Sequence, residues 1–420
     1  MIYIKRHIEQ IINKISSKKL VIVLTGPRQV GKSTMLKAQF KNHVYLTLDT
    51  PSILESAKDN PVGFINRYPS VIIDEIQKAP EIFNHIKEVV DEVIFECLEK
   101  GKPRPICKYI LTGSQSFALM ENVDETLAGR TAVISMNGLS KRELNGLDFT
   151  EPFLPTQKQL ETKDALNTIA YDYNRIIDII HKGSLPELHQ MKFDLDEWSV
   201  FMDSYIKTYI EKDVRRLINI KDETAFMKFL RATAARTGQQ LNLAAMAEAV
   251  GKDAGTMKSW LAVLQTSGLI YLLEPYSSNH SKRLTRTPKM YFMDSGLACF
   301  LAGWRTPEQL TLGASWGSIF ETWVISEIVK SYYNSGKSLL PLYYYRDKDM
   351  KEIDLIIEDG DTLYPIEIKA TTDPLKKHLA SFDVLKNISN KQIGEGAVIC
   401  LCKQSFPMHG GNWATPVDLI

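Results

Sequence analysis

A run of eight residues near the N-terminus has the composition of a phosphate-binding loop. Residues 26–33, Gly-Pro-Arg-Gln-Val-Gly-Lys-Ser, match the pattern G-x-x-x-x-G-K-[ST] at every fixed position. Glycines let backbone N–H groups turn toward phosphate oxygens, and a following helix adds its partial positive charge. Lys32 is expected to reach the β- and γ-phosphates of ATP, and the Ser33 hydroxyl to ligate Mg²⁺. The residues expected to bind the nucleotide are Gly26, Pro27, Arg28, Gln29, Val30, Gly31, Lys32, Ser33 and Thr34.

An acidic pair follows the third apolar run of the chain. Asp74 ends Val71-Ile72-Ile73-Asp74, and Glu75 comes directly after it. Asp74 is expected to hold Mg²⁺ through water, and Glu75 to polarise the attacking water. The alternative is an acidic pair that only caps a helix. Kinases acting on small molecules rarely place Glu directly after that Asp, so the pair favours hydrolysis over phosphoryl transfer.

Two further residues are candidates for work on the γ-phosphate. Ser114 follows the fourth apolar run, 109–112, and is placed to orient the lytic water, with a plain turn as the alternative. Arg130 is a candidate arginine finger, acting in cis or on a neighbouring subunit of a homo-oligomer. A solvated surface arginine is a nearly equal alternative for Arg130. Arg28 and Arg142 are weaker candidates for phosphate contact.

A second set of charged residues lies near the C-terminus. Asp354 lies in an apolar run, Gly360 marks a hairpin turn, and Glu367-Ile368-Lys369 follows in the next run. Residues 367 and 369 share one face of a strand, and Glu321 lies on an upstream amphipathic helix. This order resembles the PD-(D/E)XK nuclease core. That resemblance implies Mg²⁺ on Glu321, Asp354 and Glu367, with Lys369 positioning or activating the water, so that Asp354, Glu367 and Lys369 would be catalytic. A charged trio kept for structure or binding, without cleavage, is the alternative.

The middle of the chain has the pattern of a winged helix. Helices are expected at 241–250 and from about 253 to 266, followed by strands at 269–273 and 290–293. The intervening polar loop carries basic residues, which are Lys282, Arg283, Arg286 and Lys289. A DNA-binding role and a protein-docking role are equally favoured, because Lys258 is the one basic residue of the second helix.

The elements that position these residues are strands alternating with helices. Strands are expected at 21–24, 44–48, 71–74, 109–112 and 132–136, and helices at 7–17, from about 32, and at 81–98. We expect an α/β fold in four parts: a doubly wound parallel P-loop NTPase sheet at 1–150, a helical lid at 151–236, a winged helix at 237–300, and a C-terminal α/β PD-(D/E)XK-like domain at 301–420.

The motifs also carry a resemblance to a known family. The loop at 26–33, together with Ile-Ile-Asp-Glu-Ile-Gln at 72–77, Leu-Thr-Gly-Ser at 111–114, Leu-Ala-Gly-Arg at 127–130 and Leu-Ser-Lys-Arg-Glu-Leu at 139–144, resembles AAA+ superfamily ATPases of bacteria and archaea that carry a C-terminal DUF4143 domain. The similarity continues through 183–187 and 205–214. At the first of these the family usually shows Gly-Gly-Phe-Pro, from which Ser184 and Leu185 depart. The resemblance implies an ATPase.

Bulk composition narrows the classes of function. The 420 residues carry a net charge of +1, so any binding to nucleic acid needs a local basic patch. Five cysteines form neither a disulfide framework nor a metal-ligand pattern, which indicates a reduced, cytoplasmic protein. The sequence contains no apolar run of eighteen residues, so no membrane partner is expected. The expected partners are ATP with Mg²⁺ and, through the wing and C-terminal domain, DNA. The alternative is a nucleotide-switched binding or scaffold protein without nuclease activity.

Overall fold

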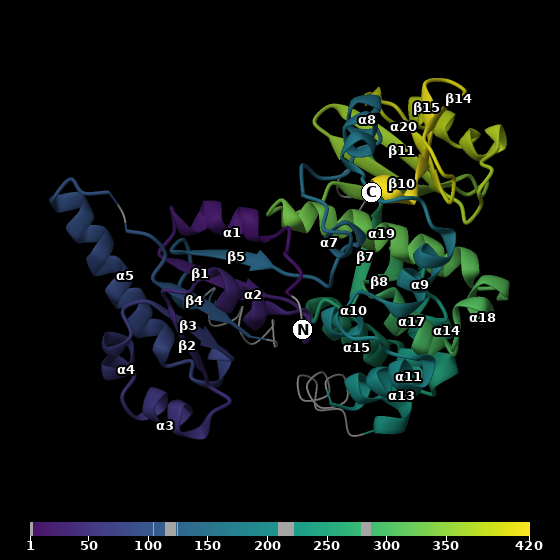
Figure 1. The fold of residues 1–420 in the computed structure, drawn as a ribbon. Helices are drawn as coiled ribbons and strands as arrows, with labels where there is room; N and C mark the ends of the chain where they lie inside the picture. The colour runs from purple at the N-terminus through teal and green to yellow at the C-terminus, as the bar shows by residue number, and fades with distance from the viewer. Residues whose placement is uncertain (1–2, 104, 114–122, 124, 209–221, 279–286) are drawn as a thin grey trace.

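The computed structural model describes residues 3–103, 105–113, 123, 125–208, 222–278 and 287–420. Figure 1 shows an N-terminal lobe, built around a parallel sheet, beside a larger lobe that contains the rest of the chain. Ser114 and the basic residues Lys282, Arg283 and Arg286 lie outside the described residues.

Five short apolar runs form the parallel sheet: β1 (Val21–Thr25), β2 (Val44–Thr47), β3 (Val71–Asp74), β4 (Tyr109–Thr112) and β5 (Thr131–Ser135). Their order is β2-β3-β4-β1-β5, so β1 lies between β4 and β5. Every residue of β1, β3 and β4 is buried, as expected for strands covered on both faces. The five expected strands are confirmed, with ends that shift by one residue.

Helices cover both faces of this sheet. They are α1 (Glu9–Ser16), α2 (Lys32–Gln39), α3 (Pro51–Asp59), α4 (Pro61–Arg67) and α5 (Ile82–Glu99). Alternate residues of β1 belong to different cores: Ile22 and Leu24 pack with residues of α1 and α2, while Val21 and Val23 pack with residues of α3, α4 and α5. The expected doubly wound arrangement is therefore present.

The segment after β5 is mostly helical, as its sequence predicts. It contains α7 (Lys141–Leu144), α8 (Gln157–Leu166), α9 (Tyr173–Lys182), α10 (Pro186–Gln190), α11 (Leu195–Tyr205) and α13 (Glu223–Ala234). A polar side chain at the start of most of these helices accepts a hydrogen bond from an N–H of the first turn, as Ser140 does for α7 and Asp172 for α9.

The expected pair of helices followed by a hairpin is present in the middle of the chain. The two helices are α14 (Leu243–Val250) and α15 (Ala254–Thr266), and Asp253 caps α15. Strands β7 (Ile270–Pro275) and β8 (Lys289–Phe292) then pair antiparallel, and β6 (Gln239–Gln240) flanks β8. Lys289 was expected in the basic loop, and this was wrong: it begins β8, is only 3% exposed, and pairs with the carboxylates of Glu321 and Glu352.

The hairpin is part of a larger sheet that continues into the C-terminal region. After α17 (Ser295–Ala302), α18 (Pro307–Leu312) and α19 (Trp316–Asn334) come β9 (Leu342–Arg346), β10 (Glu352–Asp359) and β11 (Thr362–Ile368). Next are α20 (Leu385–Ile388), β12 (Gln392–Ile393), β13 (Ala397–Cys400), β14 (Phe406–Met408) and β15 (Asn412–Pro416). The order is β14-β15-β13-β11-β10-β9-β7-β8-β6, with β12 beside β11. The β7–β8 hairpin thus has strands on both sides, and its neighbour β9 runs parallel to β7.

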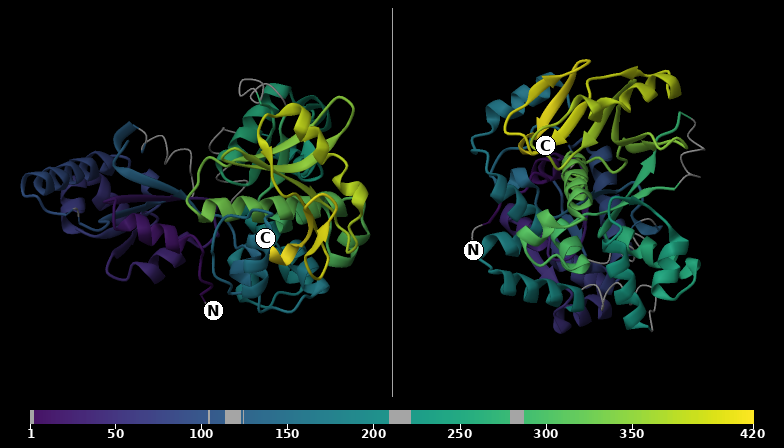
Figure 2. Two further views of the ribbon diagram at one scale, coloured as in Figure 1. Left: turned by 90° about the horizontal axis from the view of Figure 1, so that it is seen from above. Right: turned by 90° about the vertical axis from the view of Figure 1, so that its right-hand side faces the viewer.

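Helix α19 is a long, largely buried helix that connects the lobes. Figure 2 shows it running from beside the N-terminal lobe into the larger lobe, beneath the C-terminal sheet. Near its C-terminal end, Glu327 accepts a hydrogen bond from the backbone N–H of Lys141, and Lys330 donates to the carbonyl of Leu139. Among the described helices, none is long and apolar enough to cross a membrane.

Candidate functional site

The loop between β1 and α2 has a backbone that requires its two glycines. Gly26 has φ +135°, and a Cβ atom added there would lie 2.0 Å from the carbonyl oxygen of Met136. Gly31, with φ +92°, immediately precedes α2. Residues that carry a side chain rarely adopt these backbone conformations, so the shape of the loop requires the two glycines of the motif. The loop ends at the N-terminus of α2, where the helix dipole favours an anion.

The functional side chains of the loop meet the end of β3. Lys32 is buried and donates to the carbonyl oxygens of Gly26 and Pro27, each at 2.7 Å. Burial lowers the pKa of Lys32 to about 8. The Ser33 hydroxyl donates to Asp74 Oδ2 at 2.6 Å. This hydroxyl and carboxylate are the hard oxygen donors that Mg²⁺ prefers, so the residues present fit the ion that accompanies ATP.

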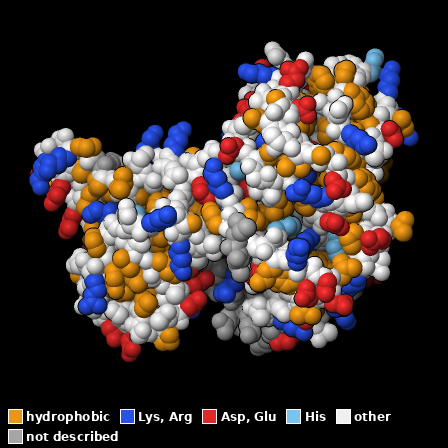
Figure 3. All heavy atoms as spheres, viewed as in Figure 1, with side chains coloured by type: hydrophobic (Ala, Val, Ile, Leu, Met, Phe, Trp, Pro, Cys, Tyr) orange, Lys and Arg blue, Asp and Glu red, His pale blue; other side chains and the backbone are white. Residues whose placement is uncertain are grey.

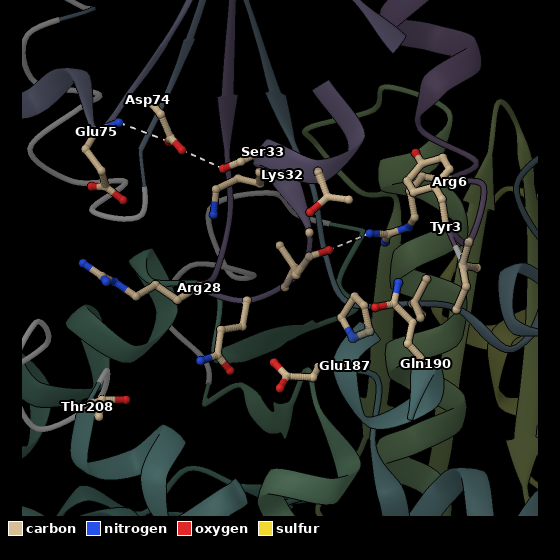
Figure 4. A pocket seen from close by; sticks show the side chains of 17 residues that line it. Tyr3, Arg6, Arg28, Lys32, Ser33, Asp74, Glu75, Glu187, Gln190 and Thr208 are labelled. Carbon is tan, nitrogen blue, oxygen red and sulfur yellow. Dashed lines mark hydrogen bonds between the residues drawn. The ribbon is translucent and has the colours of Figure 1, made fainter. Parts of the chain in front are cut away.

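Glu75 has an unusual backbone beside this pair. Its φ is +56°, in the left-handed region that residues other than glycine rarely adopt. Its N–H donates to Asp74 Oδ1 at 3.1 Å, and its carboxylate accepts from Gln77 Nε2 at 2.5 Å. Backbone strain of this kind is typical of functional sites. Figure 4 shows the Glu75 carboxylate turned toward the same space as Lys32.

A cavity of about 430 Å³ surrounds these side chains. Beyond the phosphate end, its lining comes from the N-terminal segment, the loop after β5, helix α10 and the residue Thr208 (Figure 4). That part of the lining consists of Tyr3, Ile4, Arg6, Leu139, Pro186, Glu187, Gln190 and Thr208. The cavity is thus formed by both lobes, and its volume lies within the usual range of small-molecule sites.

Buried Arg6 clamps the phosphate loop to the segment after β5. Its guanidinium donates to the carbonyls of Val30 and Asn137, both at 2.7 Å, and pairs with buried Glu143 at 3.2 Å. The turn that ends α15 also contacts the loop, since a Cβ atom on Gly268 would lie 3.0 Å from Pro27 Cγ. The loop is therefore held from both lobes.

Arg130 is not brought to the cavity. Thr131, its neighbour, pairs with Val21 at the start of β1, whereas the phosphate loop follows the end of β1. The intervening strand is roughly 15 Å long. Arg130 instead forms two hydrogen bonds to the Asp91 carboxylate of α5, at 2.5 and 2.9 Å. Arg142 lines a different, smaller cavity.

The four charged residues expected near the C-terminus do converge. Lys369 Nζ lies 2.9 Å from Asp354 Oδ2 and 2.6 Å from Glu367 Oε2. Lys289, which the sequence analysis assigned to the wing loop and not to this group, lies 3.1 Å from Glu321 Oε1 and 3.9 Å from Asp354 Oδ1. It also pairs with Glu352. We call this group the charged cluster: Lys289, Glu321, Glu352, Asp354, Glu367 and Lys369.

Burial and mutual repulsion shape the protonation of the cluster. Burial and the Asp354 charge raise the pKa of Glu321 to about 7 and that of Glu367 to about 8. Burial opposes ionisation of Asp354 as well, but Lys369 and Lys289 hold its pKa below the usual value. Burial also disfavours the charged form of Lys289. The carboxylates of Glu321, Asp354 and Glu352 favour that form more strongly, so the pKa of Lys289 is raised.

The cluster does not fit a Mg²⁺ ion as it stands. Mg²⁺ needs oxygen ligands at about 2.0–2.1 Å, but lysine ammonium groups contact Glu321, Asp354 and Glu367. Over the part of the chain that the structure describes, no group of three or more metal-binding side chains could hold an ion.

Three segments of the chain match known protein-family models. Residues 18–145 match the family model of an AAA domain, and residues 316–420 match that of the domain of unknown function DUF4143. The chain therefore contains an AAA domain and, at its C-terminal end, a DUF4143 domain. Residues 173–308 match a further domain of unknown function, DUF8612, which the sequence analysis did not anticipate.

The chain is also similar to an uncharacterized protein and to two proteins of known structure. The chain is 26% identical over 413 residues to an uncharacterized protein of Mycobacterium tuberculosis, covering 95% of this chain and 80% of that protein. A Walker-type ATPase of Pyrococcus abyssi superposes with a TM-score of 0.40 and 15% identity, covering 71% of this chain and 96% of the other. The ORC2 protein of Aeropyrum pernix superposes with a TM-score of 0.34 and 14% identity, covering 67% and 87%.

Several residues around Asp74 and the cavity were missed by sequence reasoning. Tyr45 donates to Asp74 Oδ2 at 2.5 Å, and Thr112, which pairs with Asp74 in the sheet, has a buried hydroxyl with no partner among the described residues. Helix α10 was recognised only as a family motif. The family motif at Gly183 to Glu187 was the available signal, and the structure places Pro186 and Glu187 in the lining of the cavity.

Proposed function

We propose that this protein binds ATP together with Mg²⁺ and hydrolyses it. The observation that carries the proposal is the convergence of Lys32, Ser33 and Asp74 on one cavity at the N-terminus of α2. A nucleotide lying in this cavity would have its phosphates on the loop, and its nucleoside toward Tyr3, Leu139 and α10. The match to the AAA domain model supports the same assignment.

The residues of the chain have distinct proposed roles. Lys32, which contacts two loop carbonyls, would exchange them for phosphate oxygens that neutralise its charge better. Ser33 and Asp74 would hold Mg²⁺, which supplies charge neutralisation at the phosphates. Glu75 would orient the attacking water and accept its proton. Because Glu75 lies directly beside Asp74, a water molecule is favoured over a small-molecule acceptor as the nucleophile.

Glu75→Gln tests hydrolysis separately from binding. The substitution keeps the shape of the side chain but removes the base, so ATP affinity should persist while turnover falls roughly 100-fold or more. Binding is measured by titration with ATP and Mg²⁺, and turnover by phosphate release. Turnover that is unchanged in Glu75→Gln would contradict the assigned base, and loss of both would point to collapse of the loop.

The C-terminal region leaves two candidate functions. One is Mg²⁺-dependent cleavage of DNA, supported by the convergence of Asp354, Glu367 and Lys369. The other is binding or scaffolding controlled by nucleotide, without cleavage. The contact of Lys289 with the carboxylates favours the second candidate. Nicking of plasmid DNA by the wild type with Mg²⁺ or Mn²⁺, abolished in Asp354→Ala, would overturn this preference.

The proposal that the protein acts on DNA rests on helices α14 and α15 and on the β7–β8 hairpin. Lys258 on α15 is exposed, whereas Lys289 is buried and therefore is not available for phosphate contact. We propose at most weak, salt-sensitive DNA binding by the described surface. The test is whether duplex DNA stimulates ATP turnover, and whether Lys258→Ala removes the stimulation. Strong stimulation that Lys258→Ala leaves intact would assign DNA binding to another surface.

A further inference from the structure

The charged cluster joins parts of the chain that match different family models. Glu321 lies on α19, Glu352 and Asp354 on β10, and Glu367 on β11, and Lys369 directly follows β11; all five lie within the DUF4143 match at 316–420. Lys289 lies on β8, within the DUF8612 match at 173–308. Of the two lysines of the charged cluster, Lys369 therefore comes from the DUF4143 match and Lys289 from the neighbouring module.

The contacts of Lys289 are those of a buried counter-ion. Its side chain is 3% exposed and its ammonium group pairs with Glu321, Glu352 and, at 3.9 Å, Asp354. Tyr291, also on β8, donates to Glu321 Oε1 at 2.6 Å. Four carboxyl groups in this region pair with three basic groups, which are Lys289, Arg346 and Lys369. Without Lys289, four carboxyl groups would share two basic groups in a largely buried space.

We propose that Lys289 is the resident cation of the charged cluster, filling the place that a divalent metal would take and fastening the β7–β8 hairpin to the DUF4143 domain. Each Lys289 contact crosses between the two modules. The position is also reachable from solvent, because Lys289, Arg346 and Glu352 line a groove of about 830 Å³. A dissolved cation could therefore enter if the ammonium group were removed.

The proposal predicts that removing the charge of Lys289 creates a divalent-cation site. Lys289→Met keeps most of the side-chain volume but leaves the carboxylates without their counter-ion, so the thermal unfolding midpoint should fall by roughly 10 °C with EDTA. About 5 mM Mn²⁺ should then restore at least half of that loss, because the ion binds only the folded cluster. The wild type should show no such response to Mn²⁺.

Lys330→Met is the matched control. Lys330 is also a buried lysine, 2% exposed in its side chain, but it pairs with one carboxylate, Glu327, at 2.8 Å. Its loss should destabilise the protein without creating a response to Mn²⁺. Both variants keep the nucleotide site, so cation binding there would affect them equally. Adding Glu367→Gln and Glu321→Gln to Lys289→Met should remove the Mn²⁺ response.

Comparison of the wild type with Asp354→Asn provides a test that does not depend on the folding of Lys289→Met. Titration of the nucleotide-free wild type with Mn²⁺, followed by electron paramagnetic resonance, should give the same bound signal as Asp354→Asn. A bound signal in the wild type that Asp354→Asn removes would overturn the proposal, because it would place a metal in the cluster beside Lys289. An identical Mn²⁺ response in Lys289→Met and Lys330→Met would overturn it as well.

Discussion

The Ser33 hydroxyl donates a hydrogen bond of 2.6 Å to Asp74 Oδ2, which joins the phosphate loop to the end of strand β3. The same carboxylate oxygen accepts from Tyr45 on β2. Three neighbouring elements thus fix one carboxylate at the carboxyl edge of the sheet, where ligands of open α/β sheets bind.

Asp74→Asn should weaken the use of Mg²⁺ more than it weakens the fold. If Asp74 holds the ion through water, its loss should raise the Mg²⁺ concentration needed for half-maximal turnover roughly 10- to 100-fold. Tyr45→Phe removes a hydrogen bond to the same oxygen but leaves the carboxylate, so its effect should be much smaller. Turnover measured across a Mg²⁺ titration checks both variants, and equal effects would contradict the role of Asp74.

The depressed pKa of Lys32 predicts weaker nucleotide binding in alkali. Burial lowers that pKa to about 8, and phosphates would raise it again in the complex. At pH values between the pKa of Lys32 in the free protein and its higher pKa in the complex, Lys32 must take up a proton when ATP binds. ATP affinity should therefore fall up to about tenfold per pH unit above about pH 8.

Lys32→Arg is the control for this pH dependence. Arginine stays charged in proteins, so whatever affinity remains should be flat over that range. Calorimetric titration at several pH values measures both proteins. A wild-type affinity that stays constant well above pH 8 would contradict the assignment of Lys32.

The buried pair of Arg6 and Glu143 should contribute strongly to stability. Their side chains are 4% and 0% exposed, and Arg6 also donates to the phosphate loop at Val30. Arg6→Ala leaves Glu143 buried and unpaired, which should cost about 3–5 kcal/mol of unfolding free energy. Lys5→Ala breaks the exposed pair with Asp148 and should cost less than about 1 kcal/mol. Chemical denaturation compares the two, and similar losses would be evidence against the clamp.

Arg130 should not act on the nucleotide of its own chain. It pairs with Asp91 and lies beside the start of β1, at the opposite end of this strand from the phosphate loop. Arg130→Ala should therefore leave ATP turnover within about twofold at low protein concentration. A wild-type turnover per chain that rises with protein concentration, and fails to rise in Arg130→Ala, would instead assign this arginine to a neighbouring copy. A large loss at every concentration would contradict its placement.

The N-terminal lobe was predictable because its signals are local. A β-branched run such as Val21–Leu24 followed by Gly26 and Lys32 specifies strand, turn and helix within a few residues. The hydrophobic alternation of β1 between two cores follows from the same run.

Long-range packing explains what the sequence could not predict. Lys289 looked like a wing residue because basic residues precede it in a polar loop. In the structure, helix α19 packs against β8 and brings Glu321 to Lys289, and the sheet that continues from β7 through β9 brings Asp354 on β10 close to it. Arg6 and Gln190 likewise reach the cavity only because distant segments pack against the loop. The sequence around Lys289, Arg6 and Gln190 contains no local pattern that predicts these long-range contacts.

Lys32→Ala provides the most direct test of nucleotide binding by the phosphate loop. The wild type should bind ATP with Mg²⁺ and release phosphate, and Lys32→Ala should lose at least about 100-fold in turnover, with an unfolding midpoint that ATP no longer raises. ATP binding and turnover that match the wild type in a folded Lys32→Ala protein would contradict the account.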